Sequence, residues 1–374
     1  MKNNTDVVIV GAGPVGLWTA IQTKLRNPHL HIEMFDKHSC YQRKHVLKIS
    51  KSSLSGCAAD PRLKKIIKDF TQSPKMSTNL IEEKLSGLAK KLEIKIHKDK
   101  NISDPKALPA LFPKAKVFIG ADGSHSKVRE VIFANKYNFK SDLKYVVEVK
   151  YQAQQTAPSL SPNDIYPTLK FINTIAEEHI GKPKDGITPV TIRFFIDKDN
   201  YEKMQGATFK HPYTLANESK IQKQVLENIN LWLGLRRSRG EVRIPNSEKI
   251  TVTRLGVYAS KNFAKVKNNK AWVLVGDSAF GVPFFRSLNN GLLEGTELSK
   301  RIVAALEPTT NTNDICSYIF KRTFESEFQR YDCYVSLLCI KETIAAYVKC
   351  IFLDLLSCIL KINNSVPWQV NYWT

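Results

Sequence analysis

The amino-acid sequence predicts an α/β fold in which a parallel sheet and its helices carry a second, inserted sheet. Residues 6–36 have the pattern of a strand, a glycine-rich turn, a helix and a second strand, and such a unit places its two strands parallel in one sheet. Short buried strands recur at residues 117–121 and 271–275. Residues 143–260 contain longer strands separated by polar loops, which indicates a separate antiparallel or mixed sheet.

The first strand–helix–strand unit follows from the spacing of its apolar residues. Asp6–Val10 is a short apolar strand, and Leu30–Phe35 is a second strand with apolar residues at alternate positions. The helix between them ends at Asn27, because the residue before a proline disfavours the helical conformation. Its apolar face is formed at helical spacing by Leu17, Ala20, Ile21 and Leu25.

Two further helices are expected before the strand at residues 117–121. The second starts near Asn79, and Glu82 three residues later is expected to complete a capping pair. The first helix is marked by Leu63, Ile66, Ile67 and Phe70, and the second by Ile81, Leu85, Leu88, Ala89 and Leu92.

The order of these patterns predicts a discontinuous organisation. Residues 1–140 and 265–310 are expected to form one domain, and residues 141–264 the inserted sheet domain. Residues 311–374 form a C-terminal helical segment whose last part is rich in Leu, Ile, Tyr and Cys. This segment is either a helix pair packed on the body of the protein or a surface that docks on a membrane or a partner.

Composition and charge limit the classes of protein. The chain has 374 residues, of which 43% are hydrophobic, and this is enough to bury a sizeable core. The formal net charge of +21 is unusual. A basic surface attracts nucleotides, acidic proteins or anionic lipids, although a solvated basic surface is the simpler interpretation. The sequence contains no arginine-rich arm or nucleic-acid-binding motif, so we expect no specific nucleic-acid partner.

The cysteines and the apolar runs indicate the compartment. Seven irregularly spaced cysteines without a CxxC motif favour neither a disulfide framework nor a zinc site. The apolar run Val7–Val10 leads directly into glycines, so it is a strand and not a signal peptide. No uncharged apolar run reaches the roughly 18 residues of a transmembrane helix. We therefore expect a cytoplasmic protein without a metal site.

The first motif with chemical meaning lies between the first strand and the first helix. In it, Gly11 permits a tight turn, Gly13 lets the backbone approach a pyrophosphate, and Gly16 lets the helix pack close to the strand. The helix start offers free N–H groups and a partial positive charge to phosphates. Asp36, about 20 residues further on, can bind ribose hydroxyls. These features predict a dinucleotide site, with NAD and FAD both open, at Gly11-Ala12-Gly13-Pro14-Val15-Gly16.

Two later strands end in an acid and a glycine. The strand Val117–Ala121 runs into Asp122-Gly123, and the strand Ala271–Val275 runs into Gly276-Asp277. An acid at the carboxyl end of a parallel strand can accept hydrogen bonds from the hydroxyls of a ligand. Taken singly, each pair is also compatible with an ordinary turn.

In this order and spacing the three motifs resemble the class A FAD-dependent monooxygenases of the p-hydroxybenzoate hydroxylase type, over about residues 5–310. The family motif GADGxxSxxR is matched in full from Gly120 to Arg129. The resemblance implies a Rossmann-like FAD-binding domain, with Asp277 at the ribityl or ribose hydroxyls. It also implies NAD(P)H as a transient co-substrate, and the absence of a second GxGxxG motif fits this family, which binds NAD(P)H without a second Rossmann domain. Oxygen would then reach a small molecule or a protein side chain through a flavin C4a-hydroperoxide.

A narrower likeness is to the monooxygenase domain of MICAL proteins, which oxidise actin methionines. It is carried by Asp36-Lys37-His38, by residues 41–47 and by residues 257–262. This likeness implies that Arg43 meets the FAD phosphates or ribityl chain, and a guanidinium suits a pyrophosphate. It places His45 near the isoalloxazine, although an ordinary loop histidine is the alternative. It also suggests an acidic protein such as actin as a partner.

The loop after the last motif departs from the family pattern. Pro283 and Asn290 match it, but Arg286 and Leu288 replace two glycines. These side chains either crowd the flavin loop or, through Arg286, add positive charge that favours an anionic reduced flavin. The departure leaves open an FAD-binding interaction protein with little or no turnover.

Together these considerations define a candidate site without an assigned catalytic side chain. The substrate is expected between the flavin and the inserted sheet, near Tyr258, Phe284 and Phe285. The candidate cofactor-binding residues are Gly11, Gly13, Pro14, Val15, Gly16, Asp36, Lys37, Arg43, His45, Asp122, Gly276, Asp277, Pro283 and Asn290.

Overall fold

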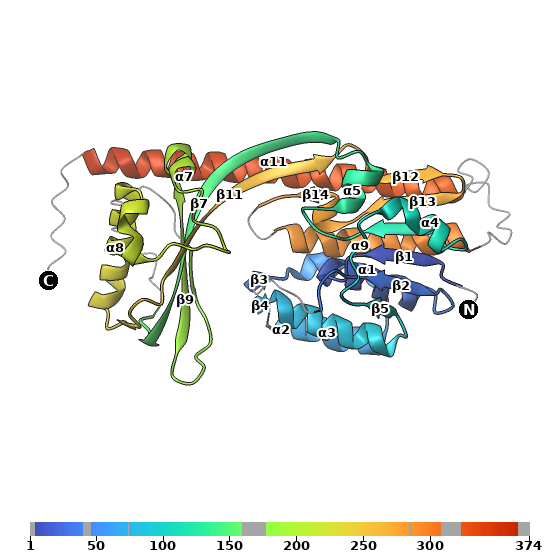
Figure 1. Cartoon of the computed structure of the whole chain (residues 1–374), viewed down its shortest axis with the longest axis horizontal. Helices are drawn as coiled ribbons and strands as arrows, with labels where there is room; N and C mark the ends of the chain where they lie inside the picture. The colour runs from blue at the N-terminus through green and yellow to red at the C-terminus, as the bar shows by residue number, and fades with distance from the viewer. Residues whose placement is uncertain are drawn as a thin grey trace. The chain divides into compact units, whose positions relative to one another are not determined.

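The chain divides into two compact units (Figure 1). A computed structural model describes residues 4–39, 46–73, 75–158, 177–283, 286–307 and 323–365. The first unit comprises Met1–Ser141 and Val257–Ile344, and the second comprises Asp142–Gly256 and Ala345–Thr374. The chain therefore leaves the first unit twice, after Ser141 and after Ile344, and returns to it once.

The first unit is built on a six-stranded sheet in the order β12-β13-β6-β1-β2-β5. The five strands from β13 to β5 are parallel, and β12 pairs antiparallel with β13, which confirms the predicted parallel sheet. The strands β1 and β6 are completely buried, as expected for the centre of such a sheet. The strands are β1 (Val7–Val10), β2 (Ile32–Phe35), β5 (Lys95–His97), β6 (Val117–Gly120), β12 (Ala264–Lys267) and β13 (Lys270–Leu274).

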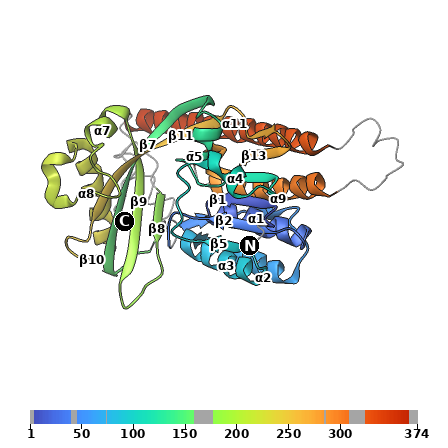
Figure 2. The ribbon, with the colours of Figure 1, turned by 45° about the vertical axis from the view of Figure 1, so that its right-hand side comes forward.

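Helix α1 lies between α3 and α9 (Figure 2). The buried indole of Trp18 on α1 donates a hydrogen bond of 2.9 Å to the hydroxyl of Thr296 on α9. This bond fixes α9 against the helix that follows the glycine-rich turn. The main helices of this unit are α1 (Pro14–Arg26), α2 (Pro61–Gln72), α3 (Thr78–Lys91), α4 (Leu108–Leu111), α5 (Lys127–Ile132) and α9 (Arg286–Leu306), and a short hairpin joins β3 (Val46–Lys48) to β4 (Lys75–Ser77).

The capping pair expected at the start of α3 is wrong. The helix begins at Thr78, one residue before Asn79, and no side chain caps it. Glu82 accepts hydrogen bonds from Ser86 at 3.1 Å and from Lys98 at 3.0 Å. Because a lysine distant in the sequence engages this carboxylate, it does not reach back to the helix start.

The second sheet is antiparallel, as the strand patterns predicted, in the order β14-β11-β7-β9-β8 with β10 beside β7. The long strands β7 and β11 run through both units, and β14 belongs to the first. Among the strands expected within residues 143–260, the one at residues 167–173 lies outside the described residues. The strands are β7 (Tyr137–Gln155), β8 (Glu177–Ile180), β9 (Thr188–Ile196), β10 (Val242–Arg243), β11 (Lys249–Ser260) and β14 (Phe280–Gly281).

Within the second unit, helix α8 (Lys223–Ser238) packs its apolar side on the sheet. Val225, Ile229 and Trp232 on α8 share one buried cluster with Val149 and Ile192 of the sheet. The short helix α7 (Lys198–Lys203) precedes it. Helix α8 therefore covers this sheet with its apolar side.

Of the C-terminal segment, the structure describes residues 323–365, which contain the long helix α11 (Phe324–Ser365). The helix pair expected for the whole segment stays a prediction, because residues 311–322 lie outside the described residues. The first part of α11 belongs to the first unit, in which Tyr331 donates a hydrogen bond of 2.9 Å to the carbonyl of Leu274. Asp332 accepts hydrogen bonds from the backbone N–H groups of Phe263 and Ala264. Among the described helices, none is long and apolar enough to cross a membrane.

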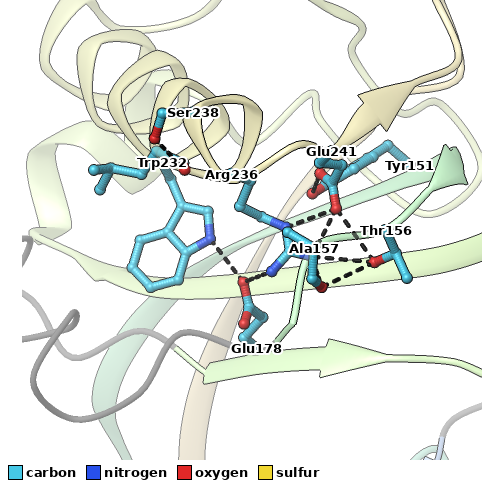
Figure 3. A network of polar contacts seen from close by, with 9 residues as sticks. Tyr151, Thr156, Ala157, Glu178, Trp232, Arg236, Ser238 and Glu241 are labelled. Carbon is cyan, nitrogen blue, oxygen red and sulfur yellow. Dashed lines mark hydrogen bonds and ion pairs between the residues drawn. The ribbon is translucent and has the colours of Figure 1, made fainter.

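A buried polar network joins α8 to β7 and β8 (Figure 3). Arg236 is 0% exposed and pairs with Glu178 and with Glu241, the latter at 2.6 Å. Tyr151 also donates a hydrogen bond to Glu241, at 2.5 Å, and Trp232 donates one to Glu178. The guanidinium therefore contacts two largely buried carboxylates, and its removal would take a cation away from both of them.

We expect the substitution Arg236→Met to destabilise the protein by roughly 3–5 kcal/mol, because it leaves buried charge uncompensated. Arg237→Met is the matched control, since Arg237 is the exposed neighbour on the same helix, and it should change stability by less than about 0.5 kcal/mol. Urea unfolding followed by circular dichroism measures both. Equal losses in the two variants would contradict the role given to the network.

Candidate cofactor site

The predicted motifs lie side by side because the strands that precede them are in register. Val10 at the end of β1 pairs with Phe35 of β2 and with Gly120 of β6. Gly120 in turn pairs with Leu274 of β13. All four strands are parallel, so their carboxyl ends share one edge of the sheet, where such sheets bind ligands. The glycine-rich turn, Asp36 and both acid–glycine pairs follow directly at this edge.

The glycine-rich turn has the geometry that its glycines predict. Gly11 has φ +106°, and a side chain there would collide with the carbonyl of Ala121. A side chain at Gly16 would collide with the carbonyl of Gly11. Gly13 is the N-cap of α1 in an extended conformation, and no side chain caps the helix.

The start of α1 is accordingly available to an anion. Pro14 occupies the first helical position, where its missing N–H costs nothing. Val15 and Gly16 follow in the first turn, whose N–H groups have no partner within the helix. The partial positive charge of the helix start favours a negatively charged ligand such as a phosphate.

Asp36 lies next to the glycine-rich turn. Its Oδ2 accepts a hydrogen bond of 2.7 Å from the N–H of Ala12, and its Oδ1 accepts one of 2.9 Å from the N–H of His38. The carboxylate thus ties the end of β2 to the turn. Each carboxylate oxygen has a second lone pair, so these bonds are compatible with the ribose contact predicted for Asp36. Lys37 beside it is exposed.

Asp122 has a local structural task that the sequence did not indicate. Its Oδ2 accepts hydrogen bonds from the N–H groups of Lys127, at 2.6 Å, and Val128, at 3.2 Å. It therefore satisfies the first N–H groups of α5. Burial raises the pKa of this carboxyl. A contact between Asp122 and ligand hydroxyls stays a prediction.

Arg129 joins the two acid–glycine motifs, a role that sequence reasoning missed although the residue closes the matched motif. It is buried, and it donates hydrogen bonds to the carbonyls of Asp277, Ser278 and Ser124 at 3.2, 2.9 and 2.5 Å. Its guanidinium also lies over the ring of Tyr258, 5.4 Å from the centroid. One side chain therefore fixes the loops after β6 and β13 relative to each other.

Tyr258 helps to hold the same loop. Its hydroxyl donates a hydrogen bond of 2.7 Å to the carbonyl of Asp277, so the tyrosine expected near the substrate also supports the backbone of a predicted cofactor residue. Phe284 and Phe285, which were expected with it, lie outside the described residues. The same holds for Arg43 and His45, so the MICAL-like tract that contains them stays a prediction.

Glu294 on α9 is the second residue that the sequence did not reveal. It is fully buried, and its Oε2 accepts a hydrogen bond of 2.8 Å from the N–H of Gly276. Burial, with the charge of Asp277 nearby, raises its pKa well above the usual value. The only available signal was an acid within the apolar stripe that includes Leu298.

Two buried polar atoms on α9 have no partner within the described part of the chain. They are the amide nitrogen of Asn290 and Oε1 of Glu294. The two residues are four positions apart, so they project from the same side of the helix. An unpaired buried polar group is costly, and a bound polar ligand would satisfy it.

The two residues that depart from the family pattern, Arg286 and Leu288, were expected in a loop but lie in the first turn of α9. Arg286 pairs with the buried carboxylate of Glu342 on α11, so its positive charge has a counter-ion within the protein. Leu288 is buried, as is Pro283. Arg286 therefore adds less net charge here than the sequence alone suggested.

We expect Glu294→Gln to change how stability depends on pH. A raised carboxyl pKa means that the contribution of Glu294 to stability is complete below the usual glutamate pKa and is lost as the pH rises through the raised pKa. The Tm of the wild type should therefore fall relative to that of Glu294→Gln as the pH rises above the usual glutamate pKa of about 4.3.

Glu297→Gln on the same helix provides the control. Although burial opposes it, the hydrogen bond from Arg301 lowers the pKa of Glu297. Its contribution is present above the usual glutamate pKa and is lost as the pH falls, so the trend should have the opposite sign. Parallel trends in the two variants would rule out the assignment for Glu294.

Comparison with known proteins identifies the fold. No family model matches the sequence, and no curated protein matches it. Solved structures do match. The tetracycline destructase Tet(51) is 12% identical, with a TM-score of 0.55 and full coverage of both chains. CtdE in complex with FAD and a substrate is also 12% identical, with a TM-score of 0.56 over 94% of this chain and 90% of that chain.

The flavin-dependent halogenase CmlS matches as well, with 11% identity and a TM-score of 0.54 over 91% of this chain and 62% of that chain. Identities this low establish the fold alone. The chain therefore has the fold of the FAD-dependent monooxygenases of the p-hydroxybenzoate hydroxylase type.

Proposed function

We propose that the protein binds FAD along the carboxyl edge of the first sheet and acts as an NAD(P)H-dependent monooxygenase. The observation that carries this proposal is the register of β2, β1, β6 and β13, which brings the glycine-rich turn, Asp36 and both acid–glycine pairs to one edge. The three structures of the same fold, one with FAD and one named as flavin-dependent, support FAD over NAD as the resident dinucleotide.

The described residues fit this cofactor. The uncapped start of α1 suits the pyrophosphate, and Asp36 suits the ribose of the adenosine half. Asp277, on the loop held by Arg129, suits the hydroxyls of the ribityl chain. The unpartnered amide of Asn290 is a donor for the flavin end. Lys37, Arg43 and His45 complete the proposed set.

When bound, FAD supplies the redox chemistry: it accepts electrons from NAD(P)H, and O2 then provides the oxygen atom that enters the substrate. The tasks of the protein are to bind and orient the cofactor and to exclude water. No described side chain is assigned as an acid or base. The substrate class stays open between a small molecule and a protein side chain, with MICAL-like oxidation of actin as one form of the latter.

A second candidate function is an FAD-binding interaction protein with little or no turnover. It is favoured by Arg286 and Leu288, which replace glycines of the flavin loop, and by the pairing of Arg286 with Glu342. In the structure both residues lie in the first turn of α9, where side chains and an ion pair restrict the backbone more than glycines would. Reduction by a nicotinamide cofactor distinguishes the two candidates.

The anion site at α1 is tested by Gly13→Asp. The backbone of Gly13 is extended at the helix N-cap, where aspartate is a preferred residue, so the variant should be at least as stable as the wild type. Its carboxylate would nevertheless repel a pyrophosphate, and we expect FAD affinity in a fluorescence titration to fall by at least about tenfold.

Gly13→Asn is the matched control, because asparagine is an equally good N-cap without the charge. It should retain more affinity for FAD than Gly13→Asp does. If the wild type takes up no FAD, the proposed function is wrong. If both variants bind FAD as the wild type does, the phosphates do not lie at α1.

Turnover is tested by anaerobic stopped-flow mixing of the FAD-loaded protein with NADPH and, separately, with NADH. The monooxygenase proposal predicts bleaching of the visible flavin absorbance, followed by peroxide or product when O2 is added. Photochemical reduction of the same sample is the control for a redox-active flavin. A flavin that light reduces but neither nicotinamide reduces would favour the interaction protein.

A further inference from the structure

Helix α11 is apolar on two opposite sides. Its buried side packs within the protein and includes Phe328, Tyr331, Val335, Cys339, Ala346 and Cys350. These residues recur at intervals of three, four and seven, as expected for one face of a helix. One apolar face is therefore enough to explain how the helix is held, and the other needs a separate explanation.

The opposite side carries eight large apolar residues that are 41–63% exposed. We call it the exposed stripe of α11, and it consists of Leu337, Ile340, Ile344, Tyr347, Val348, Ile351, Phe352 and Leu355. Leu337, Ile340 and Ile344 belong to the first unit, and the other five residues belong to the second unit. Contiguous exposed apolar residues of this kind mark interaction sites.

The charges beside the exposed stripe are biased towards positive. Both carboxylates between residues 337 and 355 are engaged by cations of the protein, Glu342 by Arg286 and Asp354 by Lys144. Lys341 is exposed within the same stretch, and the chain as a whole carries a net charge of +21. An apolar face with basic surroundings is the pattern of a helix that lies on an anionic membrane.

A second copy of the chain fits the exposed stripe less well. The residues from Leu337 to Ile351 do include the spacing of three and four that a coiled coil uses. Val348, Phe352 and Leu355, however, make the stripe wider than the narrow seam of a two-stranded coiled coil. Two copies would also bring together two chains of high positive charge.

We propose that the exposed stripe of α11 docks the protein on the surface of an anionic lipid bilayer, with the helix in the plane of the interface. Insertion would bury the apolar side chains among the acyl chains, while basic groups such as Lys341 stay at the headgroups. The helix does not span the bilayer, in agreement with its hydropathy over the described residues. This inference is independent of the proposed FAD chemistry.

Co-sedimentation of the full chain with vesicles tests the proposal. We expect binding to vesicles of phosphatidylcholine and phosphatidylserine, weaker binding to phosphatidylcholine alone, and release as salt is raised. Ile344→Glu and Val348→Glu each place a carboxylate in the exposed stripe and should weaken binding by about tenfold or more. Both positions are exposed, at 58% and 59%, so the fold should be unaffected.

Leu111→Glu is the matched control, since Leu111 is 60% exposed on α4, away from the stripe. It should bind vesicles as the wild type does. Absence of wild-type binding, or equal binding by all three variants, would overturn the proposal. Sedimentation equilibrium tests whether the stripe binds a second copy of the chain instead. If the wild type is a dimer and Val348→Glu dissociates it, the stripe is a dimer interface and the proposal of membrane docking is overturned.

Discussion

The structure depends most on the hydrogen-bond ladder that aligns the carboxyl ends of four parallel strands. The ladder continues just past the strands, through bonds from the N–H groups of Gly11, Ala121 and Val275 to carbonyls at 2.8, 2.7 and 3.0 Å. These residues open the three motifs. The motifs are therefore held in position by backbone bonds, and an extended dinucleotide can reach all of them without rearrangement of the sheet.

Side chains then connect what the ladder brings together. Arg129 joins the loops after β6 and β13, while Glu294 joins the second of these loops to α9. Trp18 fixes α9 on α1. The edge of the sheet, its loops and the two helices thus form one connected framework, which is what a binding site for a long, flexible cofactor requires.

The sequence could predict what depends on short-range patterns, and it missed what depends on distant pairs. The glycine-rich turn and the parallel strands follow from spacing within a few residues. Arg129 and Glu294 bind backbone groups that are distant in the sequence, so neither the motif that Arg129 closes nor the apolar residues around Glu294 revealed these partners. The capping pair at Asn79 failed for the same reason, because Lys98 engages Glu82. The partner of Arg286 likewise lies on a helix that the sequence could not place.

The most direct measurement is a crystal structure of the protein grown with FAD. This account predicts electron density for the pyrophosphate at the start of α1, with the ribityl chain beside Asp277. Density for the dinucleotide anywhere other than the carboxyl edge of the first sheet, or side chains that fill this edge in its place, would contradict it.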